Sequence, residues 1–307
     1  MSAIPHIDIS ALRSHDGSAR GTVAAEIGAA CREVGFFVIT GHGVAAELIA
    51  QTFAQSARFF AQPMQAKRNL AIEQLGSNRG YVGLGVEALD ETAAADHKEA
   101  FNLIWTDGGQ TRPDNVWPAL PDFREVVQRY FNEVLAVGRT LHEAFALDLG
   151  LPENFFDTKI DRPLATLRLL HYPRPTTSTP AEQIGAGTHT DYGNVTLLAT
   201  DGVAGLQVQR RDGVWVPVPP VPGAFICNIG DCLMRWTNDV YVSTPHRVLR
   251  PLAERYSIAL FVDPNPDALV RAIDSCIAPG DKPRYAPITA GDYLQQRFAS
   301  TYRAPGG

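Results

Sequence analysis

Positive charge and cysteine are both scarce in this sequence, and each shortage narrows the classes of function. The 27 lysine and arginine residues are outnumbered by 33 aspartate and glutamate residues, which gives a formal net charge of −6. Proteins that bind a phosphate backbone carry a basic surface, so no nucleic-acid partner is expected. The 4 cysteines show neither zinc-site nor disulfide-framework spacing, which predicts buried, reduced thiols at Cys31, Cys227, Cys232 and Cys276.

Long apolar segments are missing as well. No run of about 18 apolar residues occurs, so no membrane-spanning helix and no membrane partner are expected. The first residues, MSAIPHIDIS, lack the basic and then apolar segments of a secretion signal. We therefore expect a cytoplasmic protein, whose 307 residues suffice for one large domain or two closely packed ones.

The first half of the chain shows mixed helical and extended patterns. Apolar residues at intervals of three and four predict helices over three ranges: 18–34, 45–61 and 121–148. Short strands are expected at 4–9 and 36–39. The glycine-rich stretch 75–90 has no clear period, which favours a loop or a short irregular strand.

The pattern changes after about residue 160. Short strand-like runs follow one another between proline, glycine, asparagine and aspartate, at 165–172, 194–200, 205–209, 214–218, 224–229, 247–249 and 256–262. This spacing is typical of an all-β barrel or sandwich. We predict an α+β protein with a double-stranded β-helix core (a cupin-like jelly roll), with N-terminal helices packed around it. The expected regions are 1–120 (mixed α/β), 121–160 (long helix and connection), 161–275 (jelly roll) and 276–307 (tail, helical at 291–302).

The stretch GTHTDYGNVT, residues 187–196, carries the first candidate site residues. His189 and Asp191 lie two apart at the start of an expected strand, where alternate side chains point the same way. His246, in the segment STPHRV, begins another strand in the same half of the chain. Two imidazoles and one carboxylate on one side of a metal form the facial triad of non-haem Fe(II) oxygenases, which leaves positions open for O2 and a co-reactant. The HxD pattern is weak by itself, because chance matches and structural histidines are common.

The strand that begins nine residues after His246 contains an arginine, Arg255, that would need an anionic partner if it is buried. Arg255 and Ser257 share one face of this strand with Phe261. If that face lines the barrel, the guanidinium needs a partner, because an unpaired buried charge costs about 3–5 kcal/mol. The carboxylate of a bound molecule fits, since arginine binds it through two parallel hydrogen bonds and a serine hydroxyl adds another. The alternative is a surface arginine on an edge strand.

These segments together resemble a known family. His189-Thr190-Asp191, His246 and Arg255-Tyr256-Ser257 are similar to the HxD…H…RxS signature of the Fe(II)/2-oxoglutarate-dependent dioxygenases. More specifically, the chain looks like their isopenicillin N synthase-like branch. The likeness runs nearly from end to end and includes the segments EVGFF, GHG, NIGD, WTN and STPHRV.

The resemblance implies an oxidoreductase that uses Fe(II), 2-oxoglutarate and O2. It implies that Fe(II) is held by His189, Asp191 and His246. It further implies that Arg255 and Ser257 bind the distal carboxylate of 2-oxoglutarate, a group that Tyr172 also contacts at the matching position in related enzymes. The family often has asparagine where this chain has Leu170. The implied reaction couples decarboxylation of 2-oxoglutarate to succinate and CO2 with oxidation of a small molecule, foremost hydroxylation and otherwise desaturation or ring formation.

Strand parity adds candidates for substrate binding. If Tyr172 points into the barrel, so does Arg168, and a second inward arginine predicts an anionic or strongly polar substrate. The alternative is that Arg168 pairs with an internal acid. Phe261 matches a position that lines the pocket of plant relatives. Arg79 and Tyr81, in a glycine-rich loop, are candidates for capping the pocket.

Other functions share these residues. An oxidase of the isopenicillin N synthase type uses the same triad without 2-oxoglutarate, an ethylene-forming variant consumes 2-oxoglutarate itself, and a catalytically silent jelly-roll protein would only bind. A hydrolytic zinc enzyme is disfavoured, because no separate general base accompanies the site. The expected assembly is a monomer or a weak homo-oligomer.

Overall fold

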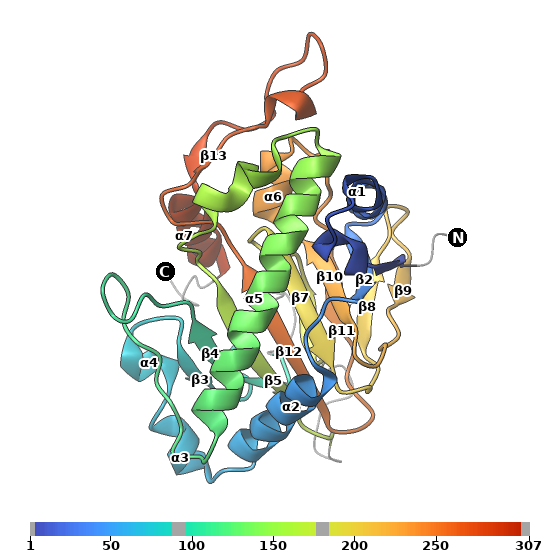
Figure 1. Cartoon of the computed structure of the whole chain (residues 1–307). Coiled ribbons are helices and arrows are strands. Elements are labelled where there is room, and N and C mark those ends of the chain that lie inside the picture. The colour runs from blue at the N-terminus through green and yellow to red at the C-terminus, as the bar shows by residue number, and fades with distance from the viewer. Residues whose placement is uncertain (1–3, 88–95, 176–183, 302–307) are drawn as a thin grey trace.

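Two β-sheets face each other in the computed structural model, which describes residues 4–87, 96–175 and 184–301 (Figure 1). The larger sheet has eight strands, in the order β1 (His6–Asp8), β2 (Phe36–Thr40), β10 (Phe225–Ile229), β7 (Val195–Thr200), β12 (Arg255–Val262), β5 (Thr166–Tyr172), β4 (Glu99–Ile104) and β3 (Gly80–Val82). The smaller sheet has four, in the order β6 (Ala186–His189), β11 (His246–Val248), β8 (Leu206–Gln209) and β9 (Trp215–Pro217). A ribbon pairs β13 (Leu269–Val270) with β14 (Ile288–Thr289). The expected α+β jelly roll is confirmed.

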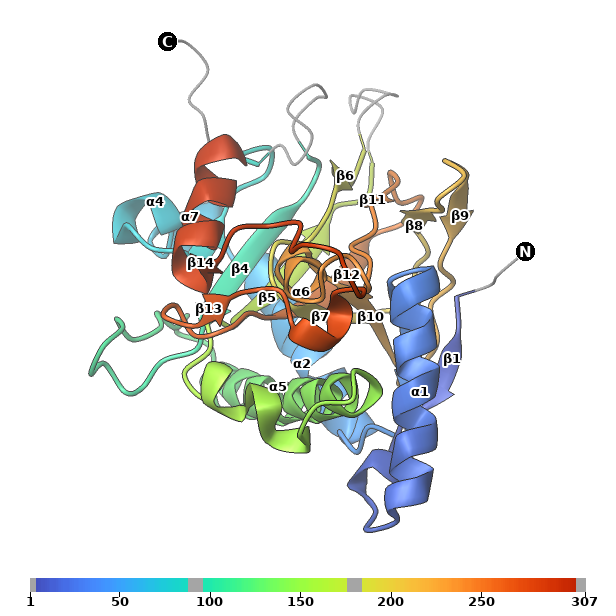
Figure 2. The same cartoon turned by 90° about the horizontal axis from the view of Figure 1, so that it is seen from above.

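Helices cover the outer face of the larger sheet. The long helices are α1 (Gly17–Glu33), α2 (Ala46–Phe60) and α5 (Phe123–Asp148). Shorter ones are α3 (Met64–Arg68), α4 (Ile72–Leu75), α6 (Asp231–Trp236) and α7 (Ala290–Thr301), with 3-10 turns at Ser10–Arg13, Glu153–Lys159 and Asp274–Cys276. Seen from above, α5 runs along one side of the larger sheet and the smaller sheet lies on the other (Figure 2). No helix in the described ranges is long and apolar enough to cross a membrane.

Helix α5 forms where the sequence predicts it because one stripe of its surface is apolar. Val127, Val134 and Leu141 lie seven residues apart and are fully buried against the sheet. Burial of each such side chain contributes about 1.5–3 kcal/mol. Gly150, with a φ of 69°, follows the last turn in the left-handed conformation that commonly ends a helix.

Strand β12 separates two apolar cores. Tyr256, Ile258 and Leu260 point towards the helices, whereas Ala259 and Phe261 point between the sheets. Arg255 and Ser257 share this inner face, which confirms the parity deduced from the sequence. The pairing with β5 is antiparallel and places Arg255 opposite Tyr172 and Ser257 opposite Leu170. Two strands thus deliver their polar side chains to one interior region.

Some elements differ from the expectations. Strand β4 is not predicted by the sequence pattern, because EAFNLI is too short for its period to separate a strand from a buried helical turn, and only its last residue escapes full burial. The stretch 75–90 contains β3, while its residues 88–90 lie outside the described ranges. The tail helix is confirmed as α7, and Tyr302 lies outside the described residues. All four cysteines are buried and free, as expected. The division into four regions stays a prediction; strands from the first region pair within the larger sheet.

Candidate active site

The three expected metal ligands meet between the sheets. Strands β6 and β11 pair antiparallel with His189 opposite His246, and Asp191 follows in the turn after β6. The Oδ1 atom of Asp191 lies 3.8 Å from Nε2 of His189 and 3.7 Å from Nε2 of His246. One ligand atom from each residue lies within 4.8 Å of the other two, which suits a single metal ion. The sequence prediction of this triad is confirmed.

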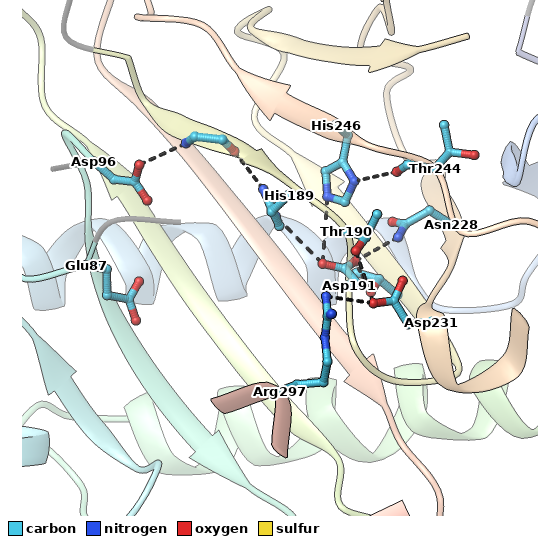
Figure 3. A network of polar contacts seen from close by, with 12 residues as sticks. Glu87, Asp96, His189, Thr190, Asp191, Asn228, Asp231, Thr244, His246 and Arg297 are labelled. Atoms are coloured by element: carbon cyan, nitrogen blue, oxygen red, sulfur yellow. Dashed lines mark hydrogen bonds and ion pairs between the residues drawn. The ribbon is translucent and has the colours of Figure 1, made fainter. Parts of the chain in front are cut away.

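Backbone carbonyls hold both imidazoles in the orientation that a metal requires. Nδ1 of His189 lies 2.8 Å from the carbonyl oxygen of Gly187, and Nδ1 of His246 lies 3.1 Å from that of Thr244 (Figure 3). Each Nδ1 therefore carries the proton and donates it, which leaves the lone pair of Nε2 directed at the shared site. Burial lowers the pKa of His189 to about 3, so this ring is neutral at pH 7.

Two neutral donors fix the third ligand. Oδ2 of Asp191 accepts hydrogen bonds from Nδ2 of Asn228 at 2.7 Å and from the Thr196 hydroxyl at 2.5 Å. Burial by itself would raise the pKa of Asp191, but the adjacent imidazoles and these two hydrogen bonds hold it below its ordinary value. The Oδ1 atom remains free to face the imidazoles. Two imidazole nitrogens and one carboxylate oxygen, all pre-oriented, fit Fe(II) with open coordination positions.

A cavity of ≈ 80 Å³ lies on one side of the triad and contains the expected co-substrate residues. Arg255 is only 1% exposed, and its guanidinium lies 4.7 Å from the centre of the Tyr172 ring. Its Nη1 donates to the Ser257 hydroxyl at 3.3 Å and its Nε to the carbonyl of Val203 at 3.2 Å. No carboxylate of the described residues lies within 4.0 Å of it, so a buried cation faces the cavity without an anionic partner. Leu170 also lines this cavity, with an apolar side chain.

A second cavity, of ≈ 130 Å³, opens on the other side of the triad. It shares His189, Asp191, Arg168 and Phe261 with the first cavity. Its remaining lining residues include Asn78, Glu87, Asn102, Thr166, Asp263 and Leu294. Arg168 and Phe261 thus point into the barrel, as strand parity predicts, and lie at the boundary between the two cavities; their contact with a substrate stays a prediction.

The other two substrate candidates lie away from both cavities. Tyr81 packs on the helix side of the sheet, where its hydroxyl donates to Oε2 of Glu99 at 2.5 Å. Arg79 donates from Nη1 to the carbonyl of Asp114 at 2.9 Å. The neighbouring Asn78 lines the second cavity instead. A one-residue step in an extended chain reverses the side-chain direction, so the sequence pattern points to the loop but not to the side chain that reaches the cavity.

Arg168 pairs with an internal acid, which is the alternative that the sequence left open. Nη2 of Arg168 lies 2.5 Å from Oε2 of Glu87. Glu87 ends the first described range and Arg168 belongs to β5, so no local sequence signal links them. Lys98, which is 4% exposed, lies 3.5 Å from the same Oε2 atom and also pairs with Asp96. Asp96 in turn accepts from the backbone N–H of Gly187 at 2.8 Å, which connects this ion cluster to the His189 strand.

A further polar chain reaches the metal ligands from the C-terminal helix. Nη2 of Arg297 in α7 lies 2.9 Å from Oδ2 of Asp231, which also accepts from the Thr190 hydroxyl at 3.1 Å (Figure 3). The backbone N–H of Asp231 donates to the carbonyl of Asp191 at 2.7 Å. The NIGD segment is recognisable in the sequence as a motif, but its contact with α7 depends on tertiary structure.

Comparison with known proteins agrees with this geometry. Residues 164–264 match the model of the 2OG-Fe(II) oxygenase superfamily, and residues 4–120 match the N-terminal model described for non-haem dioxygenases in morphine synthesis. The 2-oxoglutarate-Fe(II) type oxidoreductase hxnY of Emericella nidulans is 35% identical over 316 residues, which cover 98% of this chain and 90% of that protein.

Solved structures resemble the whole chain as well. A full-length Neurospora crassa protein in complex with alpha-KG and thymine has a TM-score of 0.90 and 32% identity, and the match covers 97% of each chain. A putative 2OG-Fe(II) oxygenase family protein of Caulobacter crescentus has a TM-score of 0.86 and 34% identity, over 98% of this chain and 99% of that one. Since its triad is also in place, this chain belongs to the 2OG-Fe(II) oxygenase superfamily and is a 2-oxoglutarate-dependent dioxygenase of the isopenicillin N synthase-like family.

Proposed function

We propose that this protein hydroxylates a small molecule, with 2-oxoglutarate and O2 as co-substrates. The observation that carries the proposal is the guanidinium of Arg255, which has no anionic partner among the described residues, is 1% exposed and faces the cavity beside the triad. A protein keeps an uncompensated buried charge at a cost of about 3–5 kcal/mol, so a bound anion is its natural partner. The distal carboxylate of 2-oxoglutarate supplies that anion.

The residues around Arg255 favour a carboxylate over other anions. The planar guanidinium donates two parallel hydrogen bonds to a carboxylate, and the Ser257 hydroxyl, 3.3 Å away, adds a third donor. The Tyr172 ring lies against the guanidinium and limits its movement, so the donors are held in one direction before the ligand arrives. We assign these three residues to co-substrate binding.

His189, Asp191 and His246 would hold Fe(II), with Asn228 and Thr196 orienting the carboxylate ligand. When bound together, Fe(II) and 2-oxoglutarate would supply the electrons that activate O2, since oxidative decarboxylation of 2-oxoglutarate would place one oxygen atom of O2 in succinate and leave the other for a substrate C–H bond. The protein keeps the two reactants in separate cavities that meet at His189, Asp191, Arg168 and Phe261. Phe261 at this boundary presents an apolar surface, which excludes water from the reacting region.

The proposed substrate is a small organic molecule bound in the second cavity. Its volume of ≈ 130 Å³ is close to the roughly 150 Å³ of a cavity that admits benzene, so one small ring fits. The similar Neurospora crassa protein has been solved with thymine and with 5-formyluracil, and JOX2 with JA, which supports a small-molecule substrate here. Arg168 and Phe261 are proposed to contact this substrate, Arg168 in its ion pair with Glu87.

Succinate formation tests the proposal and separates it from its rivals. Purified protein with Fe(II), O2 and 2-oxoglutarate should release succinate slowly without substrate and faster with the right one. An oxidase that does not use 2-oxoglutarate would release none under any condition, an ethylene-forming variant would release ethylene into the headspace, and a silent binding protein would show no turnover. His246→Ala, which removes one ligand, should abolish succinate release.

A further inference from the structure

The cations near the substrate cavity are already neutralised. Arg168 and Lys98 both contact Glu87, and Lys98 also pairs with Asp96, so two cations meet two anions. Burial would raise the pKa of Glu87, but Arg168 and Lys98 lower it to about 2, which keeps it ionised at neutral pH. Counted over these four described residues, the formal charge of the cluster is zero. Among the residues that the structure describes, a substrate carboxylate therefore finds no cation without an acidic partner here, unlike the co-substrate carboxylate at Arg255.

The cavity wall contributed by β12 carries a carboxyl group without a cationic partner among the described residues. Asp263 directly follows β12 and lies on the same side as Phe261, where it lines the cavity. In the part of the chain that the structure describes, no lysine, arginine or histidine nitrogen lies within 4.0 Å of its carboxylate. Burial and then the negative charge of Asp191 raise the pKa of Asp263 to about 7, as expected for a carboxyl group without a neighbouring cation.

The backbone next to the metal ligands leaves room for this carboxylate. Gly193 lies against Asp263, and a Cβ atom at position 193 would overlap the carboxylate oxygen Oδ1. Only a residue without a side chain at this position, two residues after Asp191 in the chain, lets Asp263 occupy its place. The position of the Asp263 carboxylate at the cavity wall therefore requires glycine at position 193, in the turn after β6.

The carboxylate of Asp263 accepts a hydrogen bond from the backbone N–H of Asn194, whereas a second acceptor in the same cavity lacks a hydrogen-bond partner. Asn102 is 2% exposed, and its Oδ1 atom is buried without a hydrogen bond among the described residues. Its Nδ2 donates to Oδ1 of Asn78 at 2.9 Å, which fixes the orientation of the amide. Buried acceptors are nearly always satisfied, so an unsatisfied one in a cavity wall indicates a ligand that donates.

We propose that the substrate carries an N–H donor on a small ring, as a lactam, cyclic imide or cyclic amine does, and that Asp263 and Asn102 accept hydrogen bonds from it. This assignment rests on the proposed oxygenase function and makes its substrate class specific. It replaces the anionic substrate expected from Arg168 by a neutral or cationic one. Arg168 then acts as the partner of Glu87 and forms part of the cavity wall.

A panel of ring compounds of matched size tests the assignment. The probes are 2-piperidone and piperidine, which carry N–H donors, N-methyl-2-piperidone, which has lost the donor, and cyclohexanecarboxylate. Binding is measured by calorimetry on protein loaded with Mn(II) and 2-oxoglutarate under anaerobic conditions, and succinate release is measured with Fe(II) and O2. The N–H compounds should bind at least about 10-fold more tightly than the other two, the effect of one hydrogen bond to a charged or buried acceptor. They should also accelerate succinate release.

Variants connect the preference to the residues. Asp263→Asn should weaken binding of the N–H compounds by about 10-fold or more and leave 2-oxoglutarate binding unchanged, which also verifies the fold. Asn102→Leu should have the same direction of effect. The matched control is Asp267→Asn, since Asp267 is exposed and pairs with Arg162 outside the cavity.

Three results would overturn the assignment: tighter binding of the carboxylate, equal binding of the N-methyl compound, or no binding by either N–H compound. Failure of the underlying function gives a different result, because 2-oxoglutarate would then neither bind with the metal nor yield succinate without substrate. Selective binding of the N–H compounds that persists in both Asp263→Asn and Asn102→Leu would likewise contradict the named acceptors.

Discussion

Replacing Arg255 by methionine should change co-substrate binding and stability in opposite directions. In the wild-type protein without ligand, the guanidinium is buried, has two neutral hydrogen-bond acceptors and no anionic partner among the described residues. Methionine has a similar length and removes the charge. The substitution therefore removes the residue that binds 2-oxoglutarate. It also removes a buried charge that lowers the free energy of unfolding of the ligand-free protein.

The magnitudes follow from these contacts. A hydrogen bond to a charged group contributes about 1.5–3 kcal/mol, so loss of a two-bond contact should cost about 3–5 kcal/mol of binding free energy and raise the Kd at least about 100-fold. For the ligand-free protein, removal of the uncompensated charge gains about 3–5 kcal/mol, while the hydrogen bonds to Val203 and Ser257 lose about 1 kcal/mol each. The net free energy of unfolding should rise by about 1–3 kcal/mol.

Two assays read out the two effects. Calorimetry on Mn(II)-loaded protein measures the Kd of 2-oxoglutarate, and urea unfolding of the metal-free protein measures stability. Arg247→Met is the matched control, because Arg247 stacks on Trp215 at 4.0 Å, contacts Gln207 and does not line the co-substrate cavity. Unchanged 2-oxoglutarate affinity in Arg255→Met, or a loss of stability of several kcal/mol, would refute the interpretation of Arg255 as a cation awaiting a ligand.

Two further predictions concern the metal ligands and the core. Asn228→Leu removes one of the two donors to Oδ2 of Asp191 and should weaken Mn(II) binding about 10- to 100-fold in a competition titration, with the fold preserved by far-ultraviolet circular dichroism; undiminished metal affinity would show that this hydrogen bond is dispensable. His142 is buried between the carbonyl of Gly138 and the amide of Asn194, and burial lowers its pKa from 6.5 to about 4. Between pH 4 and pH 6.5 the unfolded chain therefore binds more protons than the native protein, so the free energy of unfolding falls by about 3 kcal/mol as pH falls through this range. Urea unfolding of His142→Gln should lack this pH-dependent loss of stability.

The features that could be predicted from sequence are those that depend on local geometry. His189 and Asp191 are two residues apart in one extended segment, and so are Arg255 and Ser257 on β12. Because side chains alternate along a strand, the two members of each pair are expected on the same face. To predict His246 as the third ligand, it was enough to expect a second strand that begins near the first one. The 26-residue helix α5 followed from its apolar stripe.

The features that could not be predicted depend on which strands become neighbours. Thr196 and Asn228 are partners across β7 and β10, and only this register brings both to Asp191. Glu87 reaches Arg168 across 81 positions of sequence, which turned the expected substrate cation into half of an ion pair. Such pairings depend on the tertiary fold, because the residue pattern of one segment contains no information about which other segment will lie beside it.

The most direct test of the central claim is the fate of isotopically labelled O2. Turnover of 2-oxoglutarate under 18O2 with Fe(II) should place one 18O atom in each succinate molecule, and the hydroxylated product should carry the other. His246→Ala should produce no labelled succinate. Substrate oxidation by the wild-type protein without labelled succinate would contradict the account, because the triad would then act without 2-oxoglutarate.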